Sequence, residues 1–309
     1  MKIYLNTLLL ALSVSVLFFS TSCDEVEKPY RTLSNRVESV DSLRTDTMNV
    51  PVRQFVLLED FTGFKCGWCP SAGRIVDAIY VANPEAVIPI KIHVGALAEP
   101  STEHPEDYRS DVGNALDAQY NISAGGIPKG LVNRKEYNGG MLLAKDNFRA
   151  ATDVQMGKTP TAMLRTHALF DPTTRQIDVQ TRIEILTTGN LKHQLAIYIV
   201  EDSIVGTQKE YSKPIPKGGY FDPYYHNHTL RGSMNGPFGE PLRSSLPTRL
   251  TSGSSDEIAA GTVGFVSYKS QAKPEWNLVN CHIIAVLTDP GTGEVIQSFK
   301  ADLQPGTIK

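Results

Sequence analysis

Two cysteines separated by two residues, Cys66 and Cys69, constrain this chain more than any other feature of its sequence. An extended run over residues 54–61, typical of a strand, precedes them, and residues 71–82 have helical periodicity. At the start of a helix, two thiols with this spacing can close into a disulfide. In this setting the spacing indicates thiol–disulfide chemistry rather than a zinc knuckle.

The residues around the pair suggest how one thiol is activated. The thiolate is the nucleophile, so the site must lower the pKa of the attacking cysteine. We expect Cys66 near the helix N-terminus, whose free N–H groups favour an anion, and Lys65 adds a positive charge. Cys69 is close enough to attack a mixed disulfide. We therefore expect Cys66 to attack and Cys69 to resolve, with Lys65 and Trp68 tuning the site.

The stretch VLLEDFTGFKCGWCP, residues 56–70, resembles the active-site segment of thioredoxins. That family has a buried acid six residues before the first cysteine, and Asp60 stands there in this chain. The resemblance implies that Asp60 accepts the proton of Cys69, a role suited to a carboxylate whose pKa burial has raised. A surface or loop-capping acid is the alternative for Asp60, and Glu59 is the rival if the register differs by one.

A second match to thioredoxins is the dipeptide Ile127-Pro128, which follows a predicted helix and precedes a predicted strand. The resemblance implies that Pro128 is a cis proline opposite the two cysteines, where it leaves the backbone free to pair with a bound polypeptide. A trans proline in a glycine-rich turn is the alternative. The chain also departs from the family, since Lys65 replaces the usual tryptophan and the inner pair is Gly-Trp. The direction of the redox reaction therefore stays open.

The chain of 309 residues is long enough for two domains. Strands alternate with helices over residues 51–158, which predicts a thioredoxin-like α/β domain with parallel strands. Residues 159–309 read as an all-β sandwich, because runs such as 176–185 alternate apolar and polar side chains. Residues 206–256 are rich in Gly, Pro and Ser, and we expect them to form loops.

The N-terminus resembles a bacterial lipoprotein signal. Lys2 precedes an apolar run over residues 5–19, and small residues lead to Cys23. We expect residues 1–22 to be the signal peptide, Cys23 to carry lipid that anchors the protein to a membrane, and residues 23–50 to be a flexible tether. An ordinary secretory signal that leaves Cys23 as a free thiol is the alternative.

The chain as a whole is similar to the 28-kDa-type outer membrane protein family, lipoproteins of Bacteroidetes. The resemblance covers residues 50–305 and rests on the lipoprotein signal, the LLEDFTG strand leading into CGWCP, the β-rich second half and the segment 225–231. It implies an outer membrane lipoprotein on the periplasmic face or at the cell surface. It defines the compartment better than the activity.

Other candidate sites are weaker. His226 and His228 would share one face of a strand, with Asp222 nearby, but the sequence offers no convincing third metal ligand, so loop histidines are the alternative. A zinc site at the CGWC motif lacks a second ligand pair. Cys281 lies in an apolar run and reads as a buried hydrophobe or, less simply, a redox partner. His93 and His104 could approach the cysteines.

Two functions from different classes follow. In the first, the protein exchanges disulfides with the thiols or disulfides of extracytoplasmic proteins and needs no dissociable cofactor or metal. In the second, it is a surface binding or adhesion lipoprotein, and the Cys66–Cys69 bond only staples the fold. The net charge of −3 and scattered basic residues argue against a nucleic-acid partner. The sequence does not indicate the oligomeric state.

Overall fold

The computed structural model describes residues 51–214, 219–246 and 255–306. The predicted signal peptide, the tether and Cys23 lie outside the described residues. Among the residues described, no helix is long and apolar enough to cross a membrane.

The first half is built around two parallel strands. β1 (Val56–Thr62) and β2 (Val87–His93) pair in parallel and are connected through α3 (Cys69–Ala82). β3 (Lys129–Val132) pairs with the other edge of β1 in the antiparallel direction. The remaining helices here are α4 (Asp111–Tyr120), α5 (Phe148–Met156), and the short 3-10 helices η2 (Ala96–Ala98), η3 (Ser123–Gly125) and η4 (Lys145–Asn147).

Local chemistry sets the ends of these helices. Pro70 occupies the first turn of α3, where its missing N–H costs no helical hydrogen bond. The Ser110 hydroxyl accepts from the Gly113 amide at the start of α4, and Asn121 ends that helix in a left-handed conformation. The helix α5 begins only at Phe148, because the backbone of Leu143, a few residues earlier, bonds to Gly130 of β3 instead.

The helices cover both faces of the strands. Val56 and Leu58 of β1 pack against α3 and α5, while Leu57 and Phe61 point to the opposite face, where α4 packs. This alternation is the period of two that a strand imposes. All seven residues of β1 are therefore buried, including the polar residues Glu59, Asp60 and Thr62.

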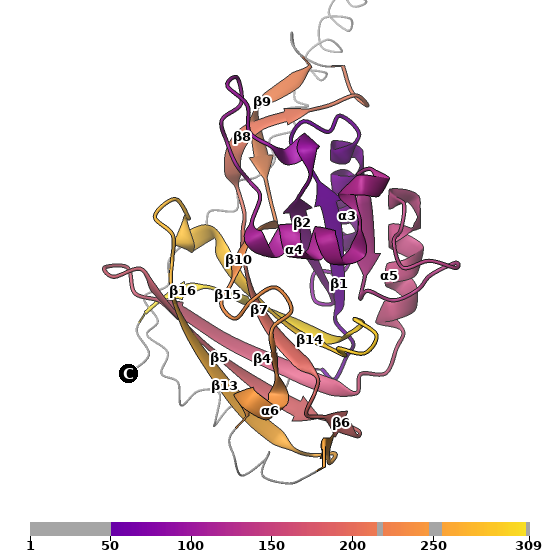
Figure 1. The fold of residues 1–309 in the computed structure, drawn as a ribbon, viewed down its shortest axis with the longest axis vertical. Coiled ribbons are helices and arrows are strands. Elements are labelled where there is room, and N and C mark those ends of the chain that lie inside the picture. The colour runs from indigo at the N-terminus through magenta and orange to yellow at the C-terminus, as the bar shows by residue number, and fades with distance from the viewer. Residues whose placement is uncertain (1–50, 215–218, 247–254, 307–309) are drawn as a thin grey trace, which may run out of the picture. The chain divides into compact units, whose positions relative to one another are not determined.

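The sheet continues into the second half of the chain. Thr229 of β10 pairs in parallel with Lys91 of β2, and the strand order within the described ranges is β15-β14-β7-β10-β2-β1-β3, with β11 also on β7 (Figure 1). The pairing therefore crosses the boundary predicted at residues 158 and 159. The assignment of the two halves to separate domains stays a prediction.

The strands of the second half, with the helices among them, have these bounds: β4 (Ala162–Phe170), β5 (Gln176–Ile185), β6 (Gly189–Asn190), β7 (Gln194–Glu201), β8 (Ile204–Lys209), β9 (Tyr220–His226), β10 (Thr229–Ser233), β11 (Glu240–Pro241), α6 (Leu242–Ser245), β12 (Glu257–Ile258), β13 (Val263–Gln271), η5 (Leu278–Asn280), β14 (Cys281–Thr288), β15 (Val295–Asp302) and β16 (Gln304–Pro305).

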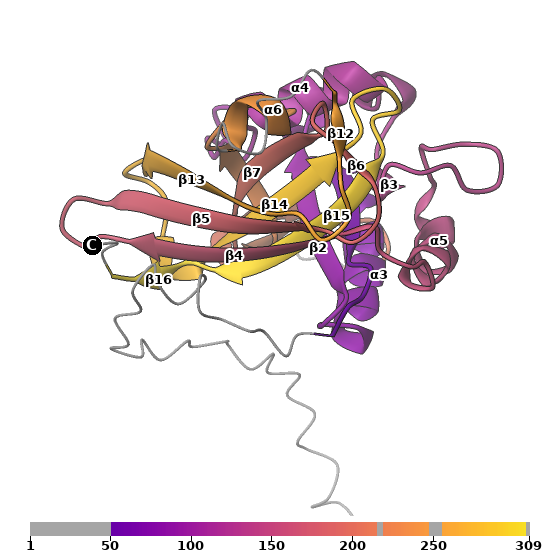
Figure 2. The ribbon, with the colours of Figure 1, turned by 90° about the horizontal axis from the view of Figure 1, so that it is seen from below.

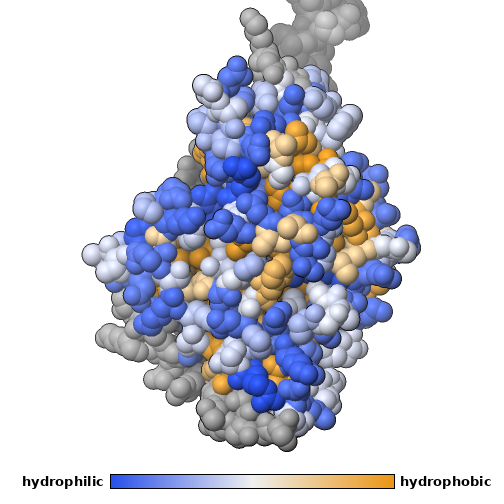
Figure 3. All heavy atoms as spheres, viewed as in Figure 1, coloured by the Kyte–Doolittle hydropathy of each residue, from blue (hydrophilic) through white to orange (hydrophobic). Residues whose placement is uncertain are grey.

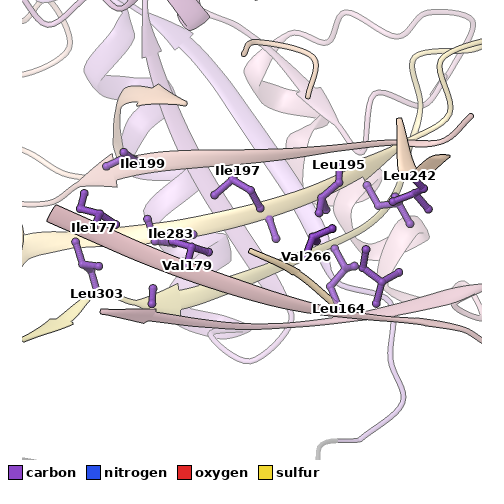
Figure 4. Close-up of a cluster of buried hydrophobic side chains, with 14 of the residues drawn as sticks. Leu164, Ile177, Val179, Leu195, Ile197, Ile199, Leu242, Val266, Ile283 and Leu303 are labelled. Atoms are coloured by element: carbon purple, nitrogen blue, oxygen red, sulfur yellow. The ribbon is translucent and has the colours of Figure 1, made fainter. Parts of the chain in front are cut away.

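A second sheet, ordered β13-β5-β4-β16, forms the other layer of a β-sandwich (Figure 2). Its core lies between this sheet and strands β7 and β14. Leu195, Ile197 and Ile199 of β7 point into this core beside Val179 and Ile283 (Figure 4). The β7 side chains between them, Ala196, Tyr198 and Val200, point the other way and pack in the hydrophobic cluster that includes α4. Burying one such aliphatic side chain contributes roughly 1.5–3 kcal/mol, so β7 links the two cores strongly.

The prediction of loops over residues 206–256 was wrong. The described part of that region contains β9, β10, β11, α6 and the end of β8. The strands β8 and β9 pair only with each other among the residues described, and they lie near the ends of β1 and β2 in Figure 1. The face viewed there is mostly hydrophilic, with hydrophobic residues in small patches (Figure 3).

Candidate active site

Cys66 and Cys69 form a disulfide with a Cα–Cα distance of 5.4 Å. The chain leaves β1 and makes two turns, in which the amide of Cys66 donates to the Gly63 carbonyl (2.9 Å) and the amide of Cys69 to the Cys66 carbonyl (3.3 Å). The helix α3 begins at Cys69, so Cys66 lies in the turn before it. Both cysteines are buried, with exposed fractions of 3% and 2%.

The Ile127–Pro128 peptide bond is cis. The carbonyl oxygen of Ile127 lies 3.9 Å from the Sγ of Cys66, so this dipeptide faces the disulfide across 61 residues of sequence. In the reduced protein, a Cys66 thiol would have an acceptor in this carbonyl. The structure therefore brings together the two segments that the sequence singled out.

Asp60 lies in the row of β1 side chains that face α3. Val56 and Leu58 precede it on that face and pack against α3, so the Asp60 carboxyl lies beneath the first part of this helix. It is 1% exposed, and neither oxygen has a hydrogen-bond partner. Burial raises its pKa to about 7, and the nearby Lys91 limits the rise. A carboxyl group with this pKa can accept or release a proton near neutral pH.

Glu59, the rival of Asp60, is committed elsewhere. Its carboxylate receives two hydrogen bonds from the buried guanidinium of Arg134, at 2.9 and 2.7 Å. This pair lies on the opposite face of β1, where Arg134 is also 3.4 Å from the hydroxyl of Tyr198. Glu59 therefore has the partner that Asp60 lacks, and it takes a structural position between the two halves.

Lys91 connects the buried acid to the surface of α3. Its ammonium donates to Asp77 at 2.7 Å, and Asp77 is exposed by 45%. Both charges act on Asp60: Lys91 lowers its pKa and Asp77 raises it. Lys91 was not among the predicted site residues. A lysine within the otherwise apolar run of β2 was the available signal, and the structure places it opposite Asp60.

The hairpin formed by β8 and β9 covers the loop that carries the disulfide. The amide of Lys209 donates to the Phe64 carbonyl at 2.8 Å, and the amide of Tyr211 to the Gly67 carbonyl at 2.8 Å. The side chain of Gln208 donates to the Cys66 carbonyl at 3.1 Å. This contact between the second half and the CGWC motif was not foreseen, because hydrogen bonds to backbone carbonyls leave no pattern in sequence.

Trp68 and Lys65, the two predicted tuning residues, lie on the outer side of this loop. The indole is 57% exposed, and its ring meets Tyr211 edge-to-face at 5.7 Å between centroids. The Lys65 ammonium lies 5.7 Å from the centre of the Phe64 ring. A Cβ atom at Gly67 would collide with the Tyr211 ring, so this glycine allows the ring to approach the loop.

Aromatic and imidazole rings anchor the base of the hairpin. His226 packs against Tyr108 (4.4 Å between centroids) and His93 (5.2 Å), and its Nε2 lies 3.2 Å from the Thr207 carbonyl. Burial lowers the pKa of His226 to about 4 and that of His93 well below its ordinary value. The Nδ1 of His104 lies 3.1 Å from the Thr207 hydroxyl. These histidines hold the hairpin near the disulfide loop.

His228, Asp222 and Cys281 lie outside the site. The Nδ1 of His228 lies 3.2 Å from a carboxylate oxygen of Asp202, whereas Asp222 is exposed on β9. Cys281 is fully buried, its thiol donates to the Asn277 carbonyl at 3.4 Å, and burial raises its pKa. In the described parts of the chain, no group of three or more His, Cys, Asp or Glu residues could hold a metal ion.

A family model described as outer membrane protein Omp28 matches residues 113–306. The match covers more than half of the chain, which therefore belongs to the Omp28 family and is an outer membrane lipoprotein. The matched range includes Pro128 and the β8–β9 hairpin but begins after the CGWC motif, so it does not define the chemistry of the cysteines. No curated protein matches the chain.

Among solved structures, HBP35 of Porphyromonas gingivalis resembles this chain with a TM-score of 0.59 and 18% sequence identity, over 84% of this chain and 79% of the other. At this identity the likeness concerns the fold alone. A domain of the outer membrane lipoprotein Omp28 from the same organism matches 48% of this chain and 93% of its own length, with 17% identity and a TM-score of 0.29, too low to support an argument.

Proposed function

We propose that this outer membrane lipoprotein exchanges disulfides with extracytoplasmic proteins through Cys66 and Cys69. Residues 51–158 would act as a thioredoxin-like domain and residues 159–309 as a β-sandwich domain. The order β1-α3-β2, followed by a cis proline and an antiparallel β3, supports the first assignment. No dissociable cofactor is required, because the electrons reside in the two sulfur atoms.

The observation that carries the proposal is the Asp60 carboxyl. It is buried, has no hydrogen-bond partner, and lies beneath the helix that begins at Cys69. Burying a polar group without a partner costs roughly 1–3 kcal/mol or more. A disulfide that only staples the fold would not need such a group. An exchange reaction does, because the departing sulfur must take up a proton.

In the proposed reaction, a thiolate of the partner protein attacks the Sγ of Cys66. The Cys66–Cys69 bond breaks as the mixed disulfide forms, and Cys69 leaves as a thiolate that takes the proton of Asp60. A second thiolate of the partner then attacks the partner's sulfur atom in the mixed disulfide, and Cys66 leaves as a thiolate. The partner gains a disulfide and loses two electrons, and this protein gains the dithiol. The same steps run in reverse, and reduce the partner, when the partner begins as a disulfide and this protein as the dithiol.

Substitution tests this reaction directly. Oxidised wild-type protein should oxidise a reduced model dithiol, and Cys66→Ser should not. The Asp60→Asn variant keeps the disulfide but loses the proton donor, and we expect a slower rate whose dependence on pH near 7 disappears. Unchanged activity in Cys66→Ser would falsify the proposal.

The second candidate is a surface binding or adhesion lipoprotein with a structural disulfide. The low exposure of Cys66 and Cys69, 3% and 2%, favours it. The reduction potential separates the two functions. A value below about −300 mV is typical of a structural disulfide, and about −120 to −270 mV is typical of an exchanging one. A redox titration against glutathione and dithiothreitol buffers, read by thiol trapping, gives this value.

A further inference from the structure

The segment 208–211, here called the covering segment, lies along the CGWC loop; its first two residues end β8 and the other two follow that strand. The amides of Lys209 and Tyr211 donate to the carbonyls of Phe64 and Gly67, both at 2.8 Å. The amide of Glu210, between them, donates in the opposite direction, to the carbonyl of Gly219 in the other arm of the hairpin. Successive amides of the segment therefore alternate between the CGWC loop and the other arm of the hairpin, as they do in an extended chain. Any extended polypeptide could make the same two hydrogen bonds, since they involve only backbone atoms.

Two side chains of the covering segment also fit groups beside the loop. Gln208 donates to the carbonyls of Cys66 (3.1 Å) and Gly63 (3.3 Å). The Glu210 carboxylate accepts from the Arg74 guanidinium at 2.7 Å, and Arg74 remains 40% exposed. The acidic side chain is thus matched by a cation on α3, next to the disulfide.

The aromatic side chain of the segment completes the match. The Tyr211 ring rests on Gly67, where a Cβ atom would collide with it, and meets the exposed indole of Trp68. The covering segment therefore presents an acidic residue followed by an aromatic residue to a surface made of Arg74 and the Gly67–Trp68 pair. The occupant and the surface are complementary in charge and in shape.

Two residues with left-handed backbone conformations connect the hairpin to the large sheet. β8 follows β7 through Ser203, and β9 precedes β10 through His228, and both residues have left-handed backbone conformations, with φ of 60° and 59°. Beyond them, β8 and β9 form a two-stranded sheet of their own within the described ranges. Displacing the covering segment from the CGWC loop therefore breaks no strand pairing of β7 or β10.

We propose that the covering segment is a self-ligand of the CGWC loop. It occupies the docking surface for an extended polypeptide partner that carries an acidic residue followed by an aromatic residue, and this partner displaces it and reaches Cys66. The inference rests on the proposed function and adds its partner class and its regulation. With the segment in place both sulfurs are buried, so exchange requires its displacement.

Reduction by dithiothreitol tests the covering separately from any partner. In Gln208→Ala and Tyr211→Ala, each of which removes contacts to the loop, the disulfide should be reduced about tenfold faster than in wild type, because roughly one hydrogen bond or ring contact no longer holds the segment down. Val205→Ala is the matched control, since Val205 lies on the same strand with 58% exposure. Equal rates in all four proteins would refute the claim that the covering segment shields the disulfide.

A pair of activated peptides tests the partner class. Both peptides carry a cysteine as a mixed disulfide with thionitrobenzoate and differ only in Glu-Tyr against Lys-Ala at the two following positions. In the reduced double variant Cys69→Ser/Tyr211→Ala, the Cys66 thiolate attacks the peptide sulfur and releases thionitrobenzoate, which absorbs visible light. We expect the Glu-Tyr peptide to react at least about fivefold faster, and the preference to vanish when Arg74→Glu is added.

The outcomes separate the two hypotheses. Equal rates for the two peptides would overturn the proposed partner class while leaving exchange intact. A failure of both peptides to release thionitrobenzoate would overturn the proposed function itself, and the dithiothreitol result would still decide whether the segment covers the disulfide.

Discussion

The most informative single substitution is Asp60→Asn, because the buried carboxyl should make the free energy of unfolding depend on pH by an amount that can be calculated. Its pKa in the folded protein is about 7, against an ordinary value of 3.8. As the pH rises from 3.8 to 7, the unfolded chain releases this proton while the folded protein retains it. The free energy of unfolding therefore falls across this window and levels off above pH 7.

The magnitude follows from the size of the shift. Three pKa units at about 1.36 kcal/mol each give a total loss of roughly 4 kcal/mol above pH 7, of which roughly 3 kcal/mol falls between pH 5 and pH 9. Asparagine has a similar shape and does not titrate, so the variant should lack this part of the pH dependence. It should be more stable than wild type at pH 9 and much closer to it at pH 5.

Urea unfolding of the oxidised protein at pH 5, 6, 7, 8 and 9 measures the difference. Asp153→Asn is the matched control, because Asp153 is an exposed acid on α5 and its substitution removes the same charge. Its curve should run parallel to that of wild type. If the Asp60→Asn curve also runs parallel, the carboxyl is ionised in the folded protein and the reasoning about proton transfer fails with it.

Three further substitutions, and the control Gly125→Ala, test other parts of the molecule by urea unfolding. Glu59→Gln leaves the buried Arg134 guanidinium without its anion and should destabilise the protein by about 3–5 kcal/mol; a loss below about 1 kcal/mol would contradict the burial of the pair. Gly67→Ala forces a methyl group into the Tyr211 ring and should cost about 1–3 kcal/mol, whereas Gly125→Ala, with open space around it, should cost little. Burial lowers the pKa of His226 to about 4, so wild type should lose about 2–3 kcal/mol from this group as the pH falls from 6.5 to 4.5, and His226→Gln should be less sensitive to acid over that range.

Much of the site could be predicted from sequence because its parts are local. The CGWC spacing, the preceding strand and the following helix lie within 30 residues, and periodicity places each of them. Asp60 was separable from Glu59 only by resemblance, since both carboxylates stand in one apolar strand. The structure separates them physically: alternation sends one toward α3 and the other toward Arg134.

The hairpin could not be predicted for the opposite reason. Residues 204–226 include glycines, prolines and charged side chains, and β8 and β9 bury few apolar residues. Their position is fixed by backbone hydrogen bonds to Phe64 and Gly67, and by packing around His226. Such bonds do not depend on side-chain type, so hydrophobic periodicity, the main signal of secondary structure in sequence, is weak there. The same holds for the β2–β10 pairing, which joins strands 138 positions apart at its single register pair of Lys91 and Thr229.

These two long-range contacts have a common consequence for the chemistry. The cysteines come from the first half of the chain, but their cover and the neighbour of β2 come from the second. A fragment limited to residues 51–158 would expose the edge of β2 beside Lys91, and it would leave four backbone carbonyls of the CGWC loop without these donors from the hairpin. Water would then reach the Asp60 carboxyl from the side of β2 and lower its pKa toward the ordinary value. The proposed proton transfer near neutral pH would thus depend on the β-rich half as much as on the motif itself.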